Sequence, residues 1–290
     1  MRKQRKISNT IITIILIFLS FLYIAPILIV LMNSFKGKLF ISDQPFVFPT
    51  FSKQDLGAAG IQPKTFVELK NYWNGVQKIH FWNAFGRSVF ITVAGVAIIV
   101  LFTSMTAWFI TRTKSHYSNT LYYLFVFSMV IPFQMVMYSM TKVANALHLD
   151  NPLGILVLYL GFGAGMSVFM FSGFIKGIPV SIEEAAIIDG CSPLQCFFRI
   201  VFPVMKPTVT TVAILNTMWI WNDYLMPYLV MGKDYPTIPI AIQYLQGGYG
   251  SIDMGAMMAM LILAIIPIIV FYVACQKYII RGVVTGAVKG

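Results

Sequence analysis

Side chains that can bind a polar solute gather in one short stretch of the sequence, between positions 219 and 224. Aromatic rings stack on the apolar faces of sugars, and amide and carboxylate groups hydrogen-bond sugar hydroxyls. Asp223 lies within an apolar run, where an acidic residue is costly unless it faces a cavity or a partner. We therefore expect a substrate pathway or, equally, a contact with a second membrane subunit, formed by Trp219, Trp221, Asn222, Asp223 and Tyr224.

The sequence lacks the residue patterns of the common catalytic sites. A phosphate-binding loop requires G-x-x-x-x-G-K-[S/T], and neither Gly37-Lys38 nor Gly232-Lys233 has the required neighbours. The sequence has three histidines and three cysteines, and none stands at the spacing of a catalytic triad or a zinc site. We therefore expect this chain to have no enzymatic activity and to bind no metal or cofactor.

The overall composition is that of a membrane protein. Of 290 residues, 58% are hydrophobic and 11% are charged, and the mean hydropathy is +0.78. A soluble domain carries about a quarter charged residues, because its surface must face water. The net charge of +11 does not indicate nucleic-acid binding, because four of the cations directly precede the first apolar run: Arg2, Lys3, Arg5 and Lys6.

Six apolar runs are long enough to cross a bilayer, which takes about 20 residues of helix. Backbone groups cannot stay unpaired in lipid, so each run should be helical. The first run is longer than the apolar region of a signal peptide, which favours a retained anchor helix. The sequence therefore predicts an all-α membrane protein with spans at 9–32, 86–111, 118–140, 153–175, 208–230 and 255–277.

The basic residues indicate how these spans are oriented. Arg112 and Lys114 lie between the second and third runs, whereas the loops after the third and fifth runs hold one lysine each. Since cytoplasmic loops carry the excess of Lys and Arg, both termini should be cytoplasmic. The expected segments are a cytoplasmic N-terminus (1–8), an outer loop (33–85), a transmembrane core (86–277) that includes a cytoplasmic loop (176–207), and a cytoplasmic tail (278–290).

The outer loop contains a predicted helix. The sequence Thr65-Phe66-Val67-Glu68 is a capping-box pattern, which marks a helix start. Apolar residues then follow at near-helical spacing, namely Leu69, Tyr72, Trp73 and Val76. We expect an amphipathic helix against the outer surface; a packed lid that contacts no partner would show the same pattern.

The cytoplasmic loop contains the pattern of a helical hairpin. Ser181 with Glu184 forms a capping box, and Gly190 suits the left-handed residue that ends a helix. Ser192 then caps a second helix, with Pro193 in its first turn. An apolar stripe follows, made of Leu194, Phe197, Phe198, Val201 and Phe202. From the pattern alone, this is a rigid surface hairpin that presents Glu183, Glu184 and Asp189 to the cytoplasm, or one that merely connects two spans.

The same stretch resembles the conserved cytoplasmic loop of ABC-importer permeases, E-A-A-x-x-x-G followed by spaced F, I and P. Matching positions include Ile200 and Pro207, and Cys191 replaces the alanine that usually follows the glycine. In such permeases the first short helix is a coupling helix, seated in a groove of a nucleotide-binding subunit. The resemblance thus implies an ATPase-coupling site formed by Glu183, Glu184, Ala185, Ala186, Asp189, Gly190, Cys191, Phe197 and Pro203.

The resemblance extends to the oligosaccharide branch, the maltose-type inner-membrane permeases. Trp221-Asn222-Asp223 with Pro227 looks like that branch, as does the C-terminal sequence, although Arg87 stands where an asparagine is common. In this branch the tail reaches into the ATPase dimer, which implies contacts from Thr285, Gly286, Ala287, Val288, Lys289 and Gly290.

The resemblance implies a type I ABC importer fold in a bacterial or archaeal cell membrane. Its implied partners are a sister permease, an ATPase homodimer that binds ATP–Mg, an extracytoplasmic solute-binding protein and a sugar. A glycerol-phosphate substrate would favour clustered Arg or Lys within the runs, which the sequence lacks. A stand-alone secondary transporter is the alternative from another class, but Asp223 is the only acidic residue within a run.

Overall fold

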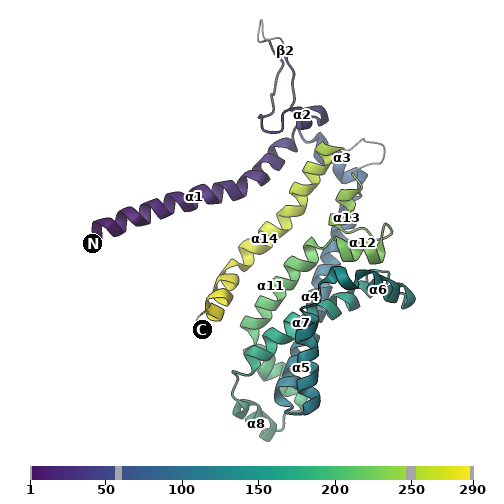
Figure 1. The fold of residues 1–290 in the computed structure, drawn as a ribbon. Helices are drawn as coiled ribbons and strands as arrows, with labels where there is room; N and C mark the ends of the chain where they lie inside the picture. Colours follow the sequence, from purple (N-terminus) through teal and green to yellow (C-terminus); the bar gives the residue numbers. More distant parts are fainter. Residues whose placement is uncertain (1, 56–60, 246–252, 288–290) are drawn as a thin grey trace. The chain divides into compact units, whose positions relative to one another are not determined.

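The computed structural model describes residues 2–55, 61–245 and 253–287, with side chains at 10–53, 63–245 and 253–278. Nearly all regular structure in these residues is helical, as Figure 1 shows. The chain divides into two compact units. Unit 1 comprises Met1–Trp82 and Ala241–Pro267, and unit 2 comprises Asn83–Ile240 and Ile268–Gly290.

Unit 1 contains the N-terminal helix and the elements of the outer loop. These are α1 (Arg2–Asn33), α2 (Lys38–Asp43), the antiparallel strands β1 (Gln54–Asp55) and β2 (Ile61–Gln62), and α3 (Lys70–Lys78). Three helices pass from one unit to the other: α4 (Phe81–Arg112), α13 (Ile238–Gln243) and α14 (Met254–Ala287). The apolar side chains of α1 are exposed along its length, as expected for a helix surrounded by lipid.

Helix α3 is present as predicted, but its start and its buried face differ from the prediction. Thr65 forms no capping box, because its hydroxyl oxygen accepts a hydrogen bond from the Thr50 N–H at 2.8 Å; α3 begins five residues later. The buried face carries Asn71 and Gly75. The Asn71 amide donates to the backbone carbonyls of Ser34 and Lys36 at 2.7 and 2.8 Å. Buried polar bonds, rather than the apolar stripe, therefore hold α3 in place.

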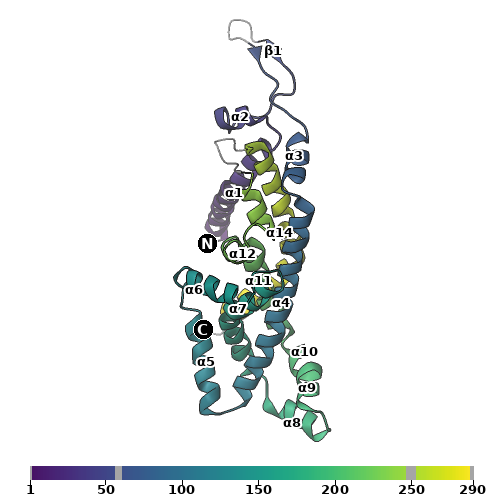
Figure 2. The same cartoon turned by 90° about the vertical axis from the view of Figure 1, so that its right-hand side faces the viewer.

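Unit 2 contains most of the remaining helices. They are α4 (Phe81–Arg112, of which Phe81 and Trp82 belong to unit 1), α5 (His116–Ser128), α6 (Phe133–Ala146), α7 (Gly154–Ile175), α8 (Val180–Ile188), α9 (Pro193–Cys196), a π-helical turn (Phe197–Val201), α10 (Phe202–Val204), α11 (Lys206–Asn222) and α12 (Leu225–Met231). One buried cluster forms around Phe171 and Phe197, and another around Tyr159. Figure 2 shows α8 and α9 at the same end of unit 2 as the turn between α4 and α5.

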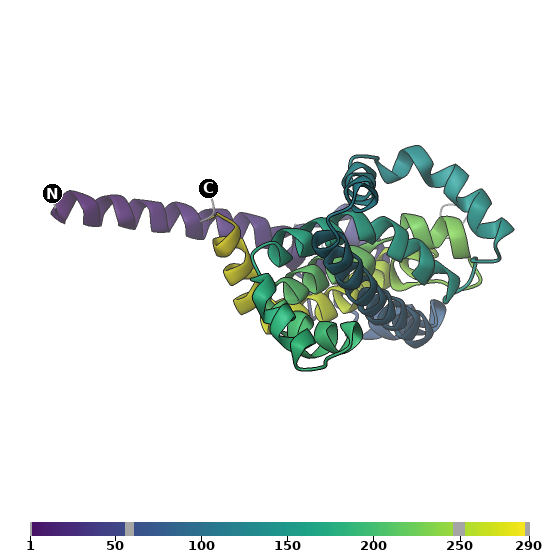
Figure 3. The same cartoon turned by 90° about the horizontal axis from the view of Figure 1, so that it is seen from below.

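The run over 118–140 forms two helices, because the chain bends by 108° between α5 and α6. Pro132 stands at the start of α6, where its ring removes a backbone donor and keeps the preceding residue out of helical geometry. Seen from below in Figure 3, α5 (teal) is viewed almost along its axis while α6 runs across the view. Apolar content continues through the bend, so hydropathy did not reveal it.

The run over 208–230 is also interrupted, because α11 ends at Asn222 and α12 begins at Leu225. Asp223 stands between them and accepts hydrogen bonds from the N–H groups of Leu225 and Met226, at 3.0 and 3.3 Å. An acceptor in this position caps a new helix start. A second bend, of 78°, separates Pro193–Val204 from α11.

The spans can now be counted for the described part of the chain. Four helices are long and apolar enough to cross a membrane: α1, α4, α7 and α14. The number rises to six if each bent pair forms one span, α5 with α6 and Pro193–Val204 with α11. Six spans therefore fit the structure only with two of them broken.

Helix α7 packs against its neighbours through glycines. A Cβ on Gly165 would lie 2.6 Å from the Ser128 hydroxyl and 2.8 Å from the Phe125 carbonyl, both on α5. A Cβ on Gly163 would lie 2.8 Å from Ile99 of α4. Gly161, by contrast, has nothing within 4 Å of its added Cβ. Close approach therefore depends on Gly163 and Gly165, on two sides of one helix.

Substitution of two glycines on α7 tests this packing. We expect Gly165→Ala to destabilise the protein by about 1–3 kcal/mol, because the new methyl group meets backbone that cannot yield easily. Gly161→Ala is the matched control and should be neutral or stabilising by up to about 1 kcal/mol, since alanine favours helix. Thermal unfolding in detergent measures both, and equal shifts would contradict the packing described.

Candidate functional site

The first helix of the predicted cytoplasmic hairpin, α8, starts earlier than its sequence pattern predicts. It begins at Val180, directly after Pro179, whose carbonyl accepts a hydrogen bond from the Ile182 N–H at 3.3 Å. Pro179 has the extended conformation of a cap residue, and the helix begins there without a side-chain cap. The predicted capping box of Ser181 and Glu184 is therefore wrong, and Ser181 lies exposed within the first turn.

The end of α8 is the predicted left-handed turn. Gly190 has a φ of +86°, which L side chains rarely adopt. Its N–H donates to the Ile187 carbonyl, and the Cys191 N–H donates to the Ala186 carbonyl, both at 3.0 Å. These two bonds form the Schellman motif, which pairs the last carbonyls of a helix. The turn therefore has one defined geometry, which Gly190 makes accessible.

The second helix of the hairpin starts as predicted but winds differently. Ser192 accepts from the Gln195 N–H, and the Gln195 side chain accepts from the Ser192 N–H, a complete capping box. Phe197–Val201 then forms a π-helical turn, which changes the side-chain spacing. Phe197 and Val201 are buried, whereas two members of the predicted apolar stripe are exposed, Leu194 and Phe198. The single predicted stripe is therefore wrong in part.

A buried ion pair holds the hairpin to the end of α4. The Glu183 carboxylate accepts two hydrogen bonds from Arg112 on one oxygen, at 2.9 Å from Nε and 2.6 Å from Nη2. Its other oxygen accepts a bond from the Trp108 indole Nε1 at 2.8 Å. Only 7% of the Glu183 side chain and 18% of the Arg112 side chain are exposed. Because every charge has a partner, the desolvation cost of this pair is offset. We call these three residues the α4 clamp.

The α4 clamp contacts the hairpin at more than one point. Arg112 also donates to the Ile178 carbonyl at 3.0 Å, just before α8. The Trp108 ring lies against the Phe197 ring of the second helix, with centroids 5.5 Å apart. One turn of α4 therefore fixes the approach to α8, a side chain within α8, and the start of the π-helical turn.

The α4 clamp corrects the predicted role of Glu183. This residue does not face outward, because it points to α4 and is 5% exposed. The outward face of α8 instead carries Glu184 and Asp189, together with apolar side chains; Ile188 is 84% exposed and Ile187 59%. Among the other predicted coupling residues, Ala185, Gly190 and Pro203 are exposed, Cys191 is half-buried, and Ala186 and Phe197 are buried.

Sequence reasoning missed Arg112 and Trp108 as parts of this site. Arg112 counted only as a topology signal, and Trp108 lay in an apolar run. They lie 71 and 75 positions from Glu183, too far for helix periodicity to connect them. The available signal was the acidic pair Glu183-Glu184, because adjacent residues on a helix cannot both face the same way.

The five predicted substrate-pathway residues lie together around the end of α11 but differ in exposure. Both oxygens of the Asp223 carboxylate have hydrogen-bond partners within the chain, because it also accepts a hydrogen bond from the Tyr159 hydroxyl at 3.0 Å. Trp221 packs edge-on against Phe85. The more accessible members are Trp219, Asn222 and, in part, Tyr224, whose ring stacks on Tyr228 with centroids 5.1 Å apart.

The structure also describes Arg87, which stands where an asparagine is common, and part of the tail. The Arg87 guanidinium donates to the Pro236 carbonyl at 3.5 Å and lies 5.8 Å from the centre of the Tyr235 ring, so it anchors the loop before α13. In the tail, the α14 backbone continues to Ala287. The side chains of Thr285, Gly286 and Ala287 are not described, and Val288, Lys289 and Gly290 lie outside the described residues.

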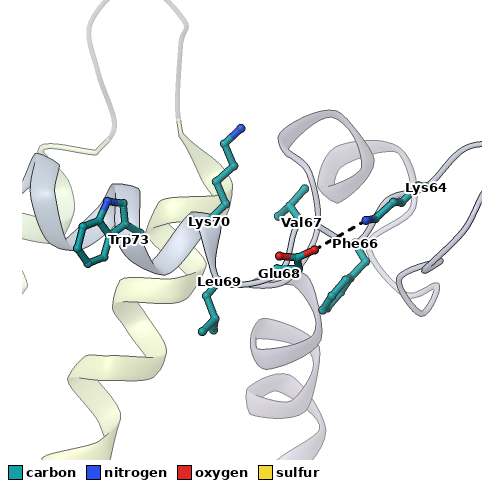
Figure 4. Close-up of a pocket in the computed structure, with 7 residues that line it drawn as sticks. All are labelled: Lys64, Phe66, Val67, Glu68, Leu69, Lys70 and Trp73. Atoms are coloured by element: carbon teal, nitrogen blue, oxygen red, sulfur yellow. Dashed lines mark ion pairs between the residues drawn. The ribbon is translucent and has the colours of Figure 1, made fainter.

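Unit 1 has a shallow hollow of about 530 Å³ beside α3. Figure 4 shows Lys70 and Trp73 of α3 and the preceding Leu69 around it, with the ion pair between Lys64 and Glu68 at 3.9 Å. Trp73 is 67% exposed. The apolar face predicted for this helix is therefore open on its side of unit 1.

A substitution that removes the charge of Glu183 but keeps its shape tests the α4 clamp. Glu183→Gln leaves the Arg112 charge buried without its counter-ion, so we expect a loss of about 3 kcal/mol or more in stability. Glu184→Gln, the exposed neighbour, is the matched control and should change stability by less than about 0.5 kcal/mol. Thermal unfolding in detergent, with limited proteolysis between positions 176 and 192, measures both. Equal unfolding temperatures and equal proteolysis of the two variants would show that the α4 clamp does not stabilise the hairpin.

Comparison with known proteins gives consistent results along the whole chain. Residues 99–285 match the family model described as binding-protein-dependent transport system inner membrane component. The chain is 37% identical to the probable starch degradation products transport system permease protein of Thermoanaerobacterium thermosulfurigenes, over 100% of both chains. It is 33% identical to the multiple sugar-binding transport system permease protein of Streptococcus mutans, again over 100% of both.

A solved structure has the same fold. One chain of the crystal structure of a bacterial ABC transporter involved in the import of the acidic polysaccharide alginate superposes with a TM-score of 0.75. The match covers 94% of this chain and 96% of that chain at 21% identity, so it establishes the type I ABC importer permease fold. Because the family model covers well over half of the sequence and both relatives match over their full length, the chain belongs to the binding-protein-dependent transport system inner membrane components.

Proposed function

We propose that this permease forms half of a heterodimeric pathway that imports an oligosaccharide, and that α8 couples it to a separate ATPase. The observation that carries the coupling assignment is the division of α8 into two faces. Glu183 is bound to Arg112 and Trp108 within the chain, whereas Glu184 and Ile188 are exposed on a helix whose position is fixed. A fixed, exposed helix can transmit the motion of a bound partner without deforming.

The partners in this proposal follow from the family and from the chain itself. A sister permease would complete the pathway, and an ATPase homodimer would bind ATP–Mg and supply the energy. An extracytoplasmic protein would deliver the substrate. In support, one similar structure is described as a bacterial alginate ABC transporter in complex with an alginate-bound periplasmic protein. The ATPase would then drive the change between inward and outward access of the pathway, because it binds these two states of the permease with different affinity.

The proposed orientation places α8 and both termini in the cytoplasm of the cell membrane. It rests on the excess of Lys and Arg in the segments beside the hairpin and at the ends of the sequence. In this orientation the tail from Thr285 to Gly290 lies on the ATPase side, where we propose that it contacts the ATPase dimer. The hollow beside α3 then lies on the outer side, on the side of the delivering protein.

The substrate class rests on the relatives and on the aromatic residues near the end of α11. The printed names of the two relatives given above refer to starch degradation products and to multiple sugars. Trp219 is 37% exposed and Asn222 is exposed, which together offer a ring face and an amide. These groups suit a neutral sugar better than glycerol phosphate, whose anionic charge would need a basic site.

Substitution of Glu184 tests the coupling assignment. In the complex co-expressed with its ATPase, we expect Glu184→Ala to reduce both ATPase copurification and sugar uptake by about tenfold, the effect of one interface hot spot. Asp150→Ala, an exposed acidic residue between α6 and α7, is the control and should leave both unchanged. Uptake by this chain alone in liposomes without ATP would instead favour the secondary transporter.

Substitution of Trp219 tests the substrate pathway. We expect Trp219→Ala to raise the KM for the sugar about fivefold, because one aromatic contact contributes about 1 kcal/mol. ATPase copurification should not change. The sugar used in the measurement is first identified by calorimetry, as the ligand of a solute-binding protein encoded by a neighbouring gene. Tyr117→Ala, an exposed aromatic residue of α5, is the control. An unchanged KM with lower complex stability would make Trp219 a packing residue or a contact with the sister permease.

A further inference from the structure

A polar cavity of about 280 Å³ lies between the ends of α4, α5 and α7 in unit 2. At roughly 30 Å³ for each water molecule, this volume corresponds to about nine waters, more than one phosphate group occupies. The cavity is near the α4 clamp, because Thr111 lines it and the next residue, Arg112, binds Glu183. None of the proposals above uses this cavity.

Two residues that line the cavity have buried hydroxyl groups with no hydrogen-bond partner among the described residues. They are Ser172, whose side chain is fully buried, and Thr111. Threonines in helices usually donate to the carbonyl four residues earlier, as Thr103 and Thr106 of α4 do, at 2.6 and 2.8 Å. A buried hydroxyl without a partner is costly, so each such group needs an explanation.

The remaining lining of the cavity is cationic and polar. Lys114 and Lys176 line it from two different loops, and Lys176 lies 5.2 Å from the centre of the Tyr122 ring. Asn119 adds an amide group. No acidic side chain lines the cavity among the described residues. Two ammonium groups and two hydroxyls around one volume match an anion with several oxygen acceptors.

We propose that this cavity binds a phosphate group, with Ser172 and Thr111 donating to its oxygens and Lys114 and Lys176 neutralising its charge. A phosphate has enough oxygens to accept from all four donors, and the remaining volume accommodates what the phosphate is attached to. Two sources share this chemistry, the headgroup of an anionic phospholipid and free inorganic phosphate. Basic pockets between membrane helices at the cytoplasmic surface commonly take lipid headgroups.

The proposal assigns a consequence to occupancy. Thr111 lines the cavity and Arg112 binds the hairpin, so a bound phosphate restrains the same turn of α4 from a second side. Binding would therefore restrain the α4 clamp without touching α8. The binding itself does not depend on the proposed substrate or on the proposed ATPase contact.

The experiment uses the full-length chain with two probes. The protein is placed in nanodiscs of phosphatidylcholine, alone or mixed with phosphatidylglycerol, and separately in detergent with inorganic phosphate. Native mass spectrometry counts the retained lipid, and thermal unfolding follows stability. Retention of phosphatidylglycerol with a raised unfolding temperature supports a lipid source. A rise with inorganic phosphate alone supports a soluble anion, and either result supports the phosphate site.

Variants distinguish a built site from general charge attraction. We expect Lys114→Gln and Lys176→Gln each to weaken binding about tenfold, the effect of one charge-assisted contact. Ser172→Ala should weaken binding several-fold while leaving the ligand-free unfolding temperature unchanged or higher, because its hydroxyl has no partner to lose. Lys142→Gln, an exposed lysine of α6, is the control.

Two results would overturn the proposal. In one, neither probe is retained or raises the unfolding temperature. In the other, the cavity variants respond to both probes as Lys142→Gln does, even if they alter ATPase copurification. That pattern would assign the lysines to a protein contact and leave the proposed function of the chain untouched.

Discussion

The buried carboxylate of Glu183 is the interaction on which the arrangement of the hairpin depends. Removing a carboxylate from water costs several kcal/mol, and only well-placed donors offset that cost. Here Arg112 and Trp108 supply three donors from the last turns of α4, and both carboxylate oxygens are used. Because the planar guanidinium and the indole each accept one geometry, α8 has one position relative to the end of α4. The remaining features of the hairpin, its left-handed turn and its capped second helix, extend from that fixed point.

The same design recurs at the other interruptions of the bundle, where polar groups of the chain itself satisfy the broken backbone. Asp223 caps α12 and also receives the Tyr159 hydroxyl, so the end of α11 is a bonded joint. At the bend after α5, the Ser128 hydroxyl donates to the Phe125 carbonyl in the last turn of α5, at 2.7 Å. In an apolar environment a break in a helix is stable only where its freed groups find partners.

Much of the fold was predictable because its signals are local. Apolar length indicated the helices, Gly190 indicated the left-handed turn, and Ser192 with Pro193 indicated the second helix start. The bend at Pro132 was not predictable from hydropathy, because membrane helices tolerate proline and the apolar residues continue on both sides. The direction of Glu183 was not predictable either, since its partners are more than 70 positions away. The partners of Asp223 were not predictable, because they are the backbone N–H groups of Leu225 and Met226 and the hydroxyl of Tyr159, 64 positions away.

The opposite directions of Glu183 and Glu184 divide the evolutionary constraints on two adjacent residues. A change at position 183 requires compensating changes at position 108 or 112. Because these positions are in the same chain, all of the changes occur within one gene. A change at position 184 involves only what lies outside the chain. The outward surface of α8, where we propose that the ATPase binds, can therefore be altered to accept a different partner subunit while the fold that carries it stays intact. Exchange of partners between related transporters would then be recorded in the exposed positions of α8, and covariation within one sequence would be concentrated at Glu183 and the last turns of α4.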